Sequence, residues 1–532
     1  MSHDHTGATS VKSEAPWPGS HKMPHWNQAE LPAPPKFSSK NWLQFLGPGL
    51  LMGGSAIGGG EWLLGPIVTA KYGGALLWLA TVSIACQVLY NIEISRYTLY
   101  TGEPIFTGKF RTLPGPHFWV MVYLLLDIGS IFPYLAASAA TPIAAVYLGH
   151  IPDPQHVPYD KALLHWLGIG VFLLALVPLI FGGKVYSSLK AVMSFKIFTV
   201  LGFLLILAVG YSHWETWAEI FTGFVRIGTV PVKDADGERL VNVFVELWEG
   251  RGFPSMDLTM VAFLSGLVAI SGQGGLTNTP ISNYTRDQGW GMGSHVGAIP
   301  SLVGGHDIQL SHVGTVFPVT SESIPRWKGW YRHVLRDQLL LWMPACFFGL
   351  ALPSMLSVEF LPRGTAVDNW VAAGMTADAV RDRVGGGFGQ FCWFMTLFCG
   401  FLVLAPTVAT TIDGIVRRWV DVFWTSSRYL RSLDPKRIRQ VYFSVLFGYA
   451  LIGVSMLAFL EQPAMLLKLA TSCYNVAFGF SCWHVAVLNT VLLPKPLRPH
   501  WLIRCGLAIS GAFFWGIAIV SLMQIAREAN WM

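Results

Sequence analysis

The chain has 532 residues, of which 52% are hydrophobic and only 12% are charged, and its mean hydropathy is +0.47. Soluble domains carry about 25% charged residues, so this composition excludes an ordinary soluble protein and indicates a polytopic membrane protein. The net charge of +6 says little by itself. We expect the partner to be the lipid bilayer and not nucleic acid.

Apolar runs long enough to cross roughly 30 Å of hydrocarbon predict eleven membrane spans. Residues 1–40 precede them, are polar and Pro-containing, and are expected to form a disordered cytoplasmic tail. In chain order, the predicted spans lie near residues 42–71, 75–99, 117–148, 161–182, 185–211, 257–285, 336–358, 387–413, 440–460, 463–493 and 501–526.

The loops between these spans differ in charge. The tail and two connections are basic, and the eighth-to-ninth connection holds seven Lys and Arg residues between 417 and 439. The loop at 212–256 is acidic, and its alternating stretch around Asp236-Gly237 predicts a β-hairpin. Because basic loops stay in the cytoplasm, the N-terminus is predicted inside and the C-terminus outside a plasma membrane, the inner membrane in a prokaryote.

Glycine-rich breaks interrupt the first and sixth predicted spans, at GGSAIGGGEW (Gly53–Trp62) and SGQGGLTNTP (Ser271–Pro280). Backbone polar groups inside lipid need partners, and a pair of such breaks in matching halves points to a transporter's binding site. The positions predict an all-α, LeuT-like fold with two inverted five-helix repeats, at 41–211 and 257–493. An eleventh transmembrane helix follows within 494–532.

The breaks supply the candidate binding residues. Glu61 is the one carboxylate in the first break, and it either ligates a cation, carries a coupling proton or satisfies the start of the second half-helix. Gln273 offers an amide oxygen and is, with Glu61, the candidate metal ligand. The full predicted substrate or ion site consists of Ser55, Gly58, Glu61, Gly272, Gln273 and Asn278.

Two other spans supply candidates for the coupling ion. Thr407, Thr410 and Thr411 lie along the eighth span, where hydroxyls form a sodium site in LeuT-like folds or simply pack between helices. Asp127 lies in the otherwise apolar LLLDIGSIF of the third span. It is either a proton relay or half of an internal ion pair, for which the fifth-span residues Lys190 and Lys196 are the candidate partners.

Three segments resemble the Nramp family of divalent-metal transporters: GPGLLMGGSAIGGGEW (47–62), ISRYTLYTGEPIFTGKFR (94–111) and APTVATTIDGIVRR (405–418). The resemblance implies a divergent member. Gly58 stands where the family has its metal-binding Asp, and Glu61 stands where it has Asn. Gly272 stands where the family has its Met ligand, so the soft thioether is missing.

The resulting hypothesis is a secondary transporter, not an enzyme, with no resident cofactor. It moves a cation, expected to be a divalent metal such as Mn²⁺, Fe²⁺ or Mg²⁺, by alternating access with H⁺ or Na⁺ coupling. The alternative is a transporter of a small organic solute such as an amino acid or amine. A membrane sensor or an embedded enzyme ranks below both, because no loop is long enough for an output domain and no catalytic motif such as HExxH occurs.

Overall fold

The computed structural model describes residues 19–36, 47–181, 184–234, 237–256, 261–300, 308–365, 372, 374–459 and 463–528. Helices coincide with the predicted spans in the same order along the chain. In the first half these are α1 (Pro48–Ala56), the π-helical turn η2 (Gly60–Leu64), α2 (Gly65–Tyr72), α3 (Trp78–Thr101), α5 (Pro116–Leu126), η4 (Ile128–Ile131), α6 (Tyr134–Leu148), α7 (Pro158–Leu174), α8 (Val177–Ile180) and α9 (Val185–Tyr211).

The second half repeats this arrangement with a broken first helix. Its spanning elements are α12 (Val261–Ile270), η5 (Gly275–Asn278), α13 (Pro280–Asp287), α15 (Ser323–Asp337), η6 (Gln338–Trp342), α16 (Met343–Phe360), α18 (Gly386–Ser426), α20 (Ile438–Phe459), α21 (Pro463–Val491) and α22 (Trp501–Glu528). Short elements outside the spans are η3 (Gly73–Leu76), α4 (Ile105–Arg111), α10 (Trp214–Gly223), α11 (Val243–Trp248), α14 (Gly293–Val296), α17 (Ala377–Val384) and α19 (Arg428–Arg431).

Within the described chain, seven helical segments are long and apolar enough to cross a membrane. The helices on either side of Leu77, bent by 95°, form an eighth if they are taken as one span. The predicted spans near 257–285 and 463–493 are also helical but are not among these segments. The predicted all-helical, polytopic membrane protein is thus confirmed, while the domain boundaries stay predictions.

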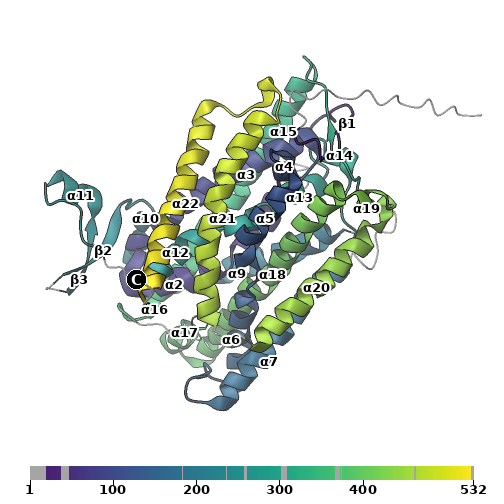
Figure 1. Ribbon diagram of the computed structural model, residues 1–532. Coiled ribbons are helices and arrows are strands. Elements are labelled where there is room, and N and C mark those ends of the chain that lie inside the picture. The colour runs from purple at the N-terminus through teal and green to yellow at the C-terminus, as the bar shows by residue number, and fades with distance from the viewer. Residues whose placement is uncertain are drawn as a thin grey trace, which may run out of the picture.

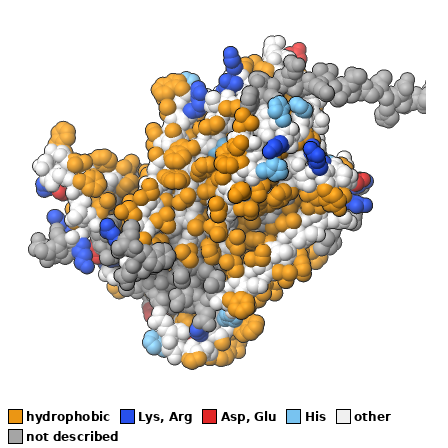
Figure 2. Space-filling view, in the orientation of Figure 1, with side chains coloured by type: hydrophobic (Ala, Val, Ile, Leu, Met, Phe, Trp, Pro, Cys, Tyr) orange, Lys and Arg blue, Asp and Glu red, His pale blue; other side chains and the backbone are white. Residues whose placement is uncertain are grey.

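The long helices run side by side as one bundle, with α21 packed along α22 and α18 along both α6 and α20 (Figure 1). Hydrophobic side chains cover the face that α20, α21 and α22 present (Figure 2). Phe447 and Leu451 of α20 and Ile509 of α22 are each more than half exposed there. Such a broad apolar surface is stable against lipid and not against water.

Residues 19–36 correct the prediction of a disordered tail. Strand β1 (Asn27–Gln28) pairs in parallel with β4 (Thr315–Val316), and Trp26 and Leu31 are buried. The average polarity of the segment concealed these few apolar anchors, whose partners lie far away in the sequence. The rest of the predicted tail, 1–18 and 37–40, lies outside the described residues.

The 212–256 loop contains an antiparallel pair of strands, β2 (Thr229–Asp234) and β3 (Gly237–Asn242). Asp234 pairs with Gly237, so the strands meet where the sequence predicts the hairpin turn, although Asp236 itself lies outside the described residues. The hairpin and α11 project from the side of the bundle (Figure 1).

Candidate functional site

The two breaks lie against each other inside the bundle. Helix α1 ends at Ala56, and the chain resumes helical form at Gly60. In the second break α12 ends at Ile270, and Gly272 has a φ of +98°, a conformation that favours glycine. A Cβ on Gly60 would lie 2.1 Å from the carbonyl oxygen of Ile270, so this glycine permits the close approach of the two chains.

Glu61 joins the two breaks. Its Oε2 accepts a hydrogen bond from the N–H of Gly58 at 3.0 Å, and its Oε1 accepts one from the N–H of Gly272 at 2.7 Å. The side chain is fully buried. One carboxylate therefore satisfies one backbone donor from each interrupted helix, and Glu61, Gly58 and Gly272 lie together as the sequence predicts.

Gln87 of α3 is a site residue that sequence reasoning missed. Its Oε1 accepts from the N–H of Gln273 at 2.8 Å and from Asn278 Nδ2 at 3.2 Å. Its Nε2 donates to the carbonyl of Ser271 at 2.8 Å. Gln87 thus joins Glu61 as a second side chain that hydrogen-bonds to the backbone of the second break. The sequence does contain a signal for Gln87. Three polar residues, Ser83, Gln87 and Asn91, are spaced four apart and so lie on one face of an apolar helix.

The predicted amide residues also contact the first break and α3. Gln273 Nε2 donates to the carbonyl of Met52 in α1 at 3.0 Å, and Asn278 Nδ2 donates to Asn91 Oδ1 at 2.9 Å. Ser55 shares a hydrogen bond of 2.6 Å with Thr410 of α18. The structure therefore gathers most of the predicted residues at one place.

Lys196 contacts Thr407, one of the threonines of the eighth span that the sequence suggests as a sodium site. Its Nζ donates to Thr407 Oγ1 at 2.6 Å and to the carbonyl of Val403 at 2.7 Å, and the side chain is fully buried. It interacts electrostatically with Glu61. The sequence suggests Lys196 only as a partner of Asp127. The predicted pairing with Asp127 is wrong, because the side chain of Lys196 in α9 binds Val403 and Thr407 of α18 instead.

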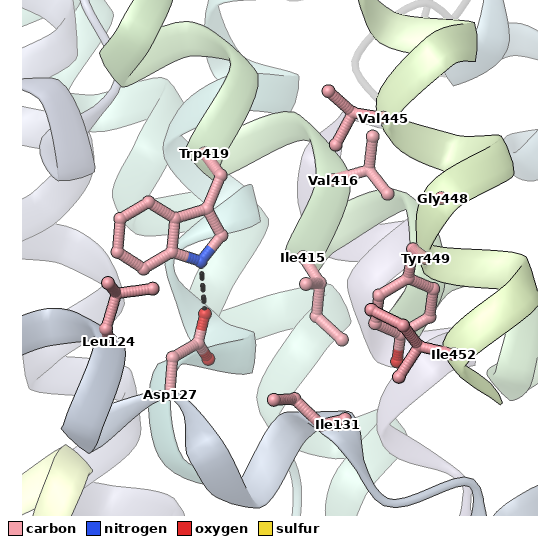
Figure 3. Close-up of a pocket in the computed structure, with 10 residues that line it drawn as sticks. All are labelled: Leu124, Asp127, Ile131, Ile415, Val416, Trp419, Val445, Gly448, Tyr449 and Ile452. Atoms are coloured by element: carbon pink, nitrogen blue, oxygen red, sulfur yellow. Dashed lines mark hydrogen bonds between the residues drawn. The ribbon is translucent and has the colours of Figure 1, made fainter. Parts of the chain in front are cut away.

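Asp127 pairs with Arg418 of α18 and with neither predicted lysine. Arg418 Nε donates to Asp127 Oδ2 at 2.9 Å, and Trp419 Nε1 donates to the same oxygen at 2.8 Å (Figure 3). Arg418 Nη1 also donates to the carbonyl of Leu276 in the second break at 2.9 Å. The ion pair was invisible in the sequence because Arg418 reads there as the start of a basic loop.

Two cavities adjoin these groups. Asp127 lines one of about 400 Å³ between α5, α18 and α20, whose other walls are almost wholly apolar (Figure 3). The second, about 30 Å³, lies between the breaks, which is room for one small ion or water molecule. Its walls include Ser55, Gly58, Gly59, Tyr134, Gly272, Gln273, Gly274, Thr277, Thr407, Thr411 and Tyr474.

Oxygen atoms are the ligands that this small cavity offers, from hydroxyl groups, the Gln273 amide and the backbone. Among the described residues, no group of three or more His, Cys, Asp or Glu side chains could hold a metal ion. The site is therefore suited to a hard, oxygen-preferring ion and lacks the sulfur and imidazole groups that select softer metals.

No family pattern and no curated protein matches the chain. Solved structures do. The manganese transporter of Eremococcus coleocola, in complex with an aromatic bis-isothiourea substituted compound, is similar over 92% of this chain and 95% of its own, with a TM-score of 0.56 and 12% identity. The chain has the fold of these manganese transporters. Two mutants of that transporter agree, at 14% and 13% identity with TM-scores of 0.56 and 0.54, covering 92% and 93% of this chain and 95% and 96% of theirs.

The shared fold confirms the predicted LeuT-like architecture with broken first and sixth helices. At this level of identity the likeness concerns the fold, and the chemistry of the site is argued from its own residues.

Proposed function

We propose that this protein is a secondary transporter that moves a cation across the membrane by alternating access around the two breaks. The proposed substrate class is a divalent metal ion, and the similar structures are those of manganese transporters. We further propose that it lies in the plasma membrane, the inner membrane in a prokaryote, with its N-terminus in the cytoplasm and its C-terminus outside.

The observation that carries the proposal is the position of Glu61. Free N–H groups at broken helices attract anions such as a substrate carboxylate. Here the N–H groups of Gly58 and Gly272 already bind the chain's own carboxylate. An amino acid would have to displace a tethered group of the same chemistry, whereas a cation is attracted to it. The arrangement favours a cation over an organic acid.

The donors that line the small cavity between the breaks narrow the class of cation, and Glu61 adjoins this cavity through its hydrogen bonds to Gly58 and Gly272. Gln273, Ser55 and the backbone supply oxygen atoms, which suit Mn²⁺ and Mg²⁺ better than softer metals. Fe²⁺ is borderline between hard and soft metals, and the site lacks the thioether ligand that would favour it. Among the three ions considered from the sequence, Mn²⁺ best combines these donors with the likeness to manganese transporters.

The coupling ion is proposed to be the proton. Lys196 Nζ already donates to Thr407 Oγ1, an oxygen that a sodium ion at this place would need. The buried acid at the breaks, Glu61, is the proposed proton carrier, whereas Asp127 is held in an ion pair with Arg418. Intramembrane acids with such partners are typical of proton-coupled carriers.

The test is Glu61→Gln in proteoliposomes that are supplied with radioactive manganese from outside. A Gln side chain presents one acceptor and one donor, so one of the two backbone N–H groups loses its partner. With a neutral interior and an acidic exterior, so that protons flow inward with the cation, we expect uptake to fall to background while the amount of folded protein in the membrane is unchanged. Glu246→Gln, in the 212–256 loop, is the matched control and is expected to transport normally. Undiminished manganese uptake by Glu61→Gln contradicts the proposed site.

A further inference from the structure

The larger of the two cavities lies away from the breaks and opens toward the lipid-facing surface. Its volume of about 400 Å³ falls within the range of roughly 300–1,000 Å³ that is typical of small-molecule sites. Figure 3 shows Leu124 and Trp419 on one side of an open space and Val445, Gly448 and Ile452 on the other. Leu124 of α5 and Ile452 of α20 are each more than half exposed, so the rim of the cavity belongs to the outer surface of the bundle.

The polar groups in the wall of this cavity already have partners. Asp127 Oδ2 accepts from Arg418 Nε and from Trp419 Nε1, and its Oδ1 accepts from Arg418 Nη2. The Tyr449 hydroxyl donates to the carbonyl of Ser130 at 3.1 Å. The other side chains of the wall are aliphatic. Apolar cavities stay dry and take up apolar molecules, so this one favours an apolar occupant over a polar solute.

The cavity lies near the middle of the membrane. Asp127 stands eleven residues beyond the start of α5 at Pro116, and Gly448 stands ten residues beyond the start of α20 at Ile438. With a rise of about 1.5 Å per residue, both lie roughly 15 Å from those helix starts, which is half of the roughly 30 Å hydrocarbon core. The ends of phospholipid acyl chains lie at this depth.

Helix α20 leaves the room that such a chain needs. Val445, Gly448 and Ile452 are three and four residues apart and so lie on one face of the helix. A Cβ on Gly448 would have no atom within 4 Å, so the glycine forms a notch between two aliphatic side chains. The notch is continuous with the apolar surface that α20 presents to lipid, where Phe447 and Leu451 are exposed.

We propose that the end of a phospholipid acyl chain occupies this cavity, entering from the bilayer between α5 and α20. The chain packs against Ile415 of α18 and excludes water from the ion pair between Asp127 and Arg418, which a low dielectric strengthens. Arg418 also donates to the carbonyl of Leu276, so the chain lies one residue away from the second break. The proposal needs the membrane-spanning fold and depends on neither the cargo nor the coupling ion.

Photo-crosslinking of the full-length protein in phosphatidylcholine vesicles tests the proposal. The vesicles contain a phosphatidylcholine with a diazirine at the end of one acyl chain, and the adducts are mapped by mass spectrometry after irradiation. Ile415 and Val416 line the cavity but are only 6% and 1% exposed. A chain on the outer surface reaches Phe447 or Leu451 and not these residues. We therefore expect adducts on residues 415–419 of α18.

Gly448→Phe fills the cavity and provides the comparison. Excluding even two buried methylene groups weakens the binding of a chain by roughly tenfold, so adducts on residues 415–419 are expected to fall by about that factor. Adducts on Ile509, exposed on α22, are expected to be unchanged. Gly516→Phe is the matched control, because Gly516 of α22 is also exposed and a Cβ there also has no atom within 4 Å.

Two results would overturn the proposal. Unaltered protein without adducts on residues 415–419 would show that acyl chains do not enter the cavity, and equal labelling of these residues in Gly448→Phe would show that the adducts form elsewhere. If Gly448→Phe fails to fold, Val445→Trp, which narrows the cavity from the same helix, takes its place. Absent manganese uptake by the unaltered protein would refute the proposed transport and leave the crosslinking result to be judged by itself.

Discussion

At the scale of single residues, the centre of the molecule holds one buried acidic and one buried basic side chain, each hydrogen-bonded to neutral groups. Glu61 takes two backbone N–H groups, and Lys196 gives hydrogen bonds to a hydroxyl and a carbonyl. Burying either charge alone is expensive unless it is hydrogen-bonded and near an opposite charge. The two residues thus depend on each other, although their side chains come from helices more than a hundred residues apart.

Lys196 provides a prediction about the coupling ion. Replacing all sodium by N-methyl-D-glucamine is expected to leave the initial rate of manganese uptake unchanged, since the ammonium of Lys196 already occupies the Thr407 hydroxyl. Lys196→Met is expected to lose roughly tenfold in uptake, because the buried Val403 carbonyl and Thr407 hydroxyl lose their donor. Lys233→Met, on the exposed strand β2, is the control. Sodium-dependent uptake by the unaltered protein would contradict the proposed role of Lys196.

At the same scale, the sequence identified Glu61, Gln273 and Asn278 because each lies inside a visible break. It did not identify Gln87 or the role of Lys196, because their partners are set by how α3 and α9 pack on the breaks. Asp127 was recognised as a costly intramembrane acid, but its pairing with Arg418 required the bundle. Residue type and depth are readable in a sequence, whereas the choice of partner depends on the fold.

At the scale of elements, the N-terminal segment 19–36 is the feature that pattern reading misjudged. Besides the pairing of β1 with β4, it is attached to the bundle through a buried acid, Glu103, which follows α3. Glu103 accepts from Trp26 Nε1 at 3.0 Å, from Arg111 Nε at 2.7 Å and from the N–H of Gly314 at 3.0 Å. Arg111 in turn donates to the carbonyl of Pro24. One carboxylate therefore joins the segment, α4 and the chain before β4.

Glu103 makes the attachment of this segment sensitive to acid. Burial by itself raises the pKa of the Glu103 carboxyl, but the Arg111 guanidinium and the surrounding donors outweigh it and hold that pKa below its usual range. A carboxyl whose pKa is lowered by folding stabilises the protein above its unfolded pKa, near 4.3, and this stability is lost as the pH falls through the folded value.

We therefore expect the melting temperature to fall in acid below the ordinary carboxyl range, and part of that fall to be absent in Glu103→Gln. At neutral pH, Glu103→Gln is expected to lose about 3–5 kcal/mol of stability, because Arg111 is left buried without its counter-charge. Melting curves of both proteins across the acid range measure the difference, with Glu322→Gln, at an exposed acid, as the control. Parallel pH profiles for Glu103→Gln and the unaltered protein would refute this account.

At the scale of the whole molecule, the order of spans and the two breaks were enough to predict the architecture that the chain shares with manganese transporters at 12% identity. Backbone satisfaction in lipid constrains where helices lie and where they may break, so the fold tolerates many exchanges of side chains. The site is less constrained in this way. Gly58 and Gly272 lie at the breaks, and the side chains around them supply a set of oxygen donors that the fold alone does not fix.

The orientation of the molecule is the prediction that the structure makes more precise. Of the seven basic residues counted between 417 and 439, Arg417 and Arg418 are buried in ion pairs and do not act as loop charges. Five basic residues remain in that connection, together with the basic N-terminal tail, against the acidic 212–256 loop. Because the positive-inside rule counts charges that stay in loops, the predicted orientation is unchanged but rests on fewer residues.

Cysteine labelling in intact cells with a membrane-impermeant maleimide tests this orientation. Trp248→Cys, at a residue 92% exposed in α11, is expected to react from outside, and Ser432→Cys, exposed between α19 and α20, only after the cells are opened. The exposed native Cys505 is replaced by Ser in both proteins, so that it does not contribute. The reverse pattern would contradict the predicted orientation and place the C-terminus in the cytoplasm.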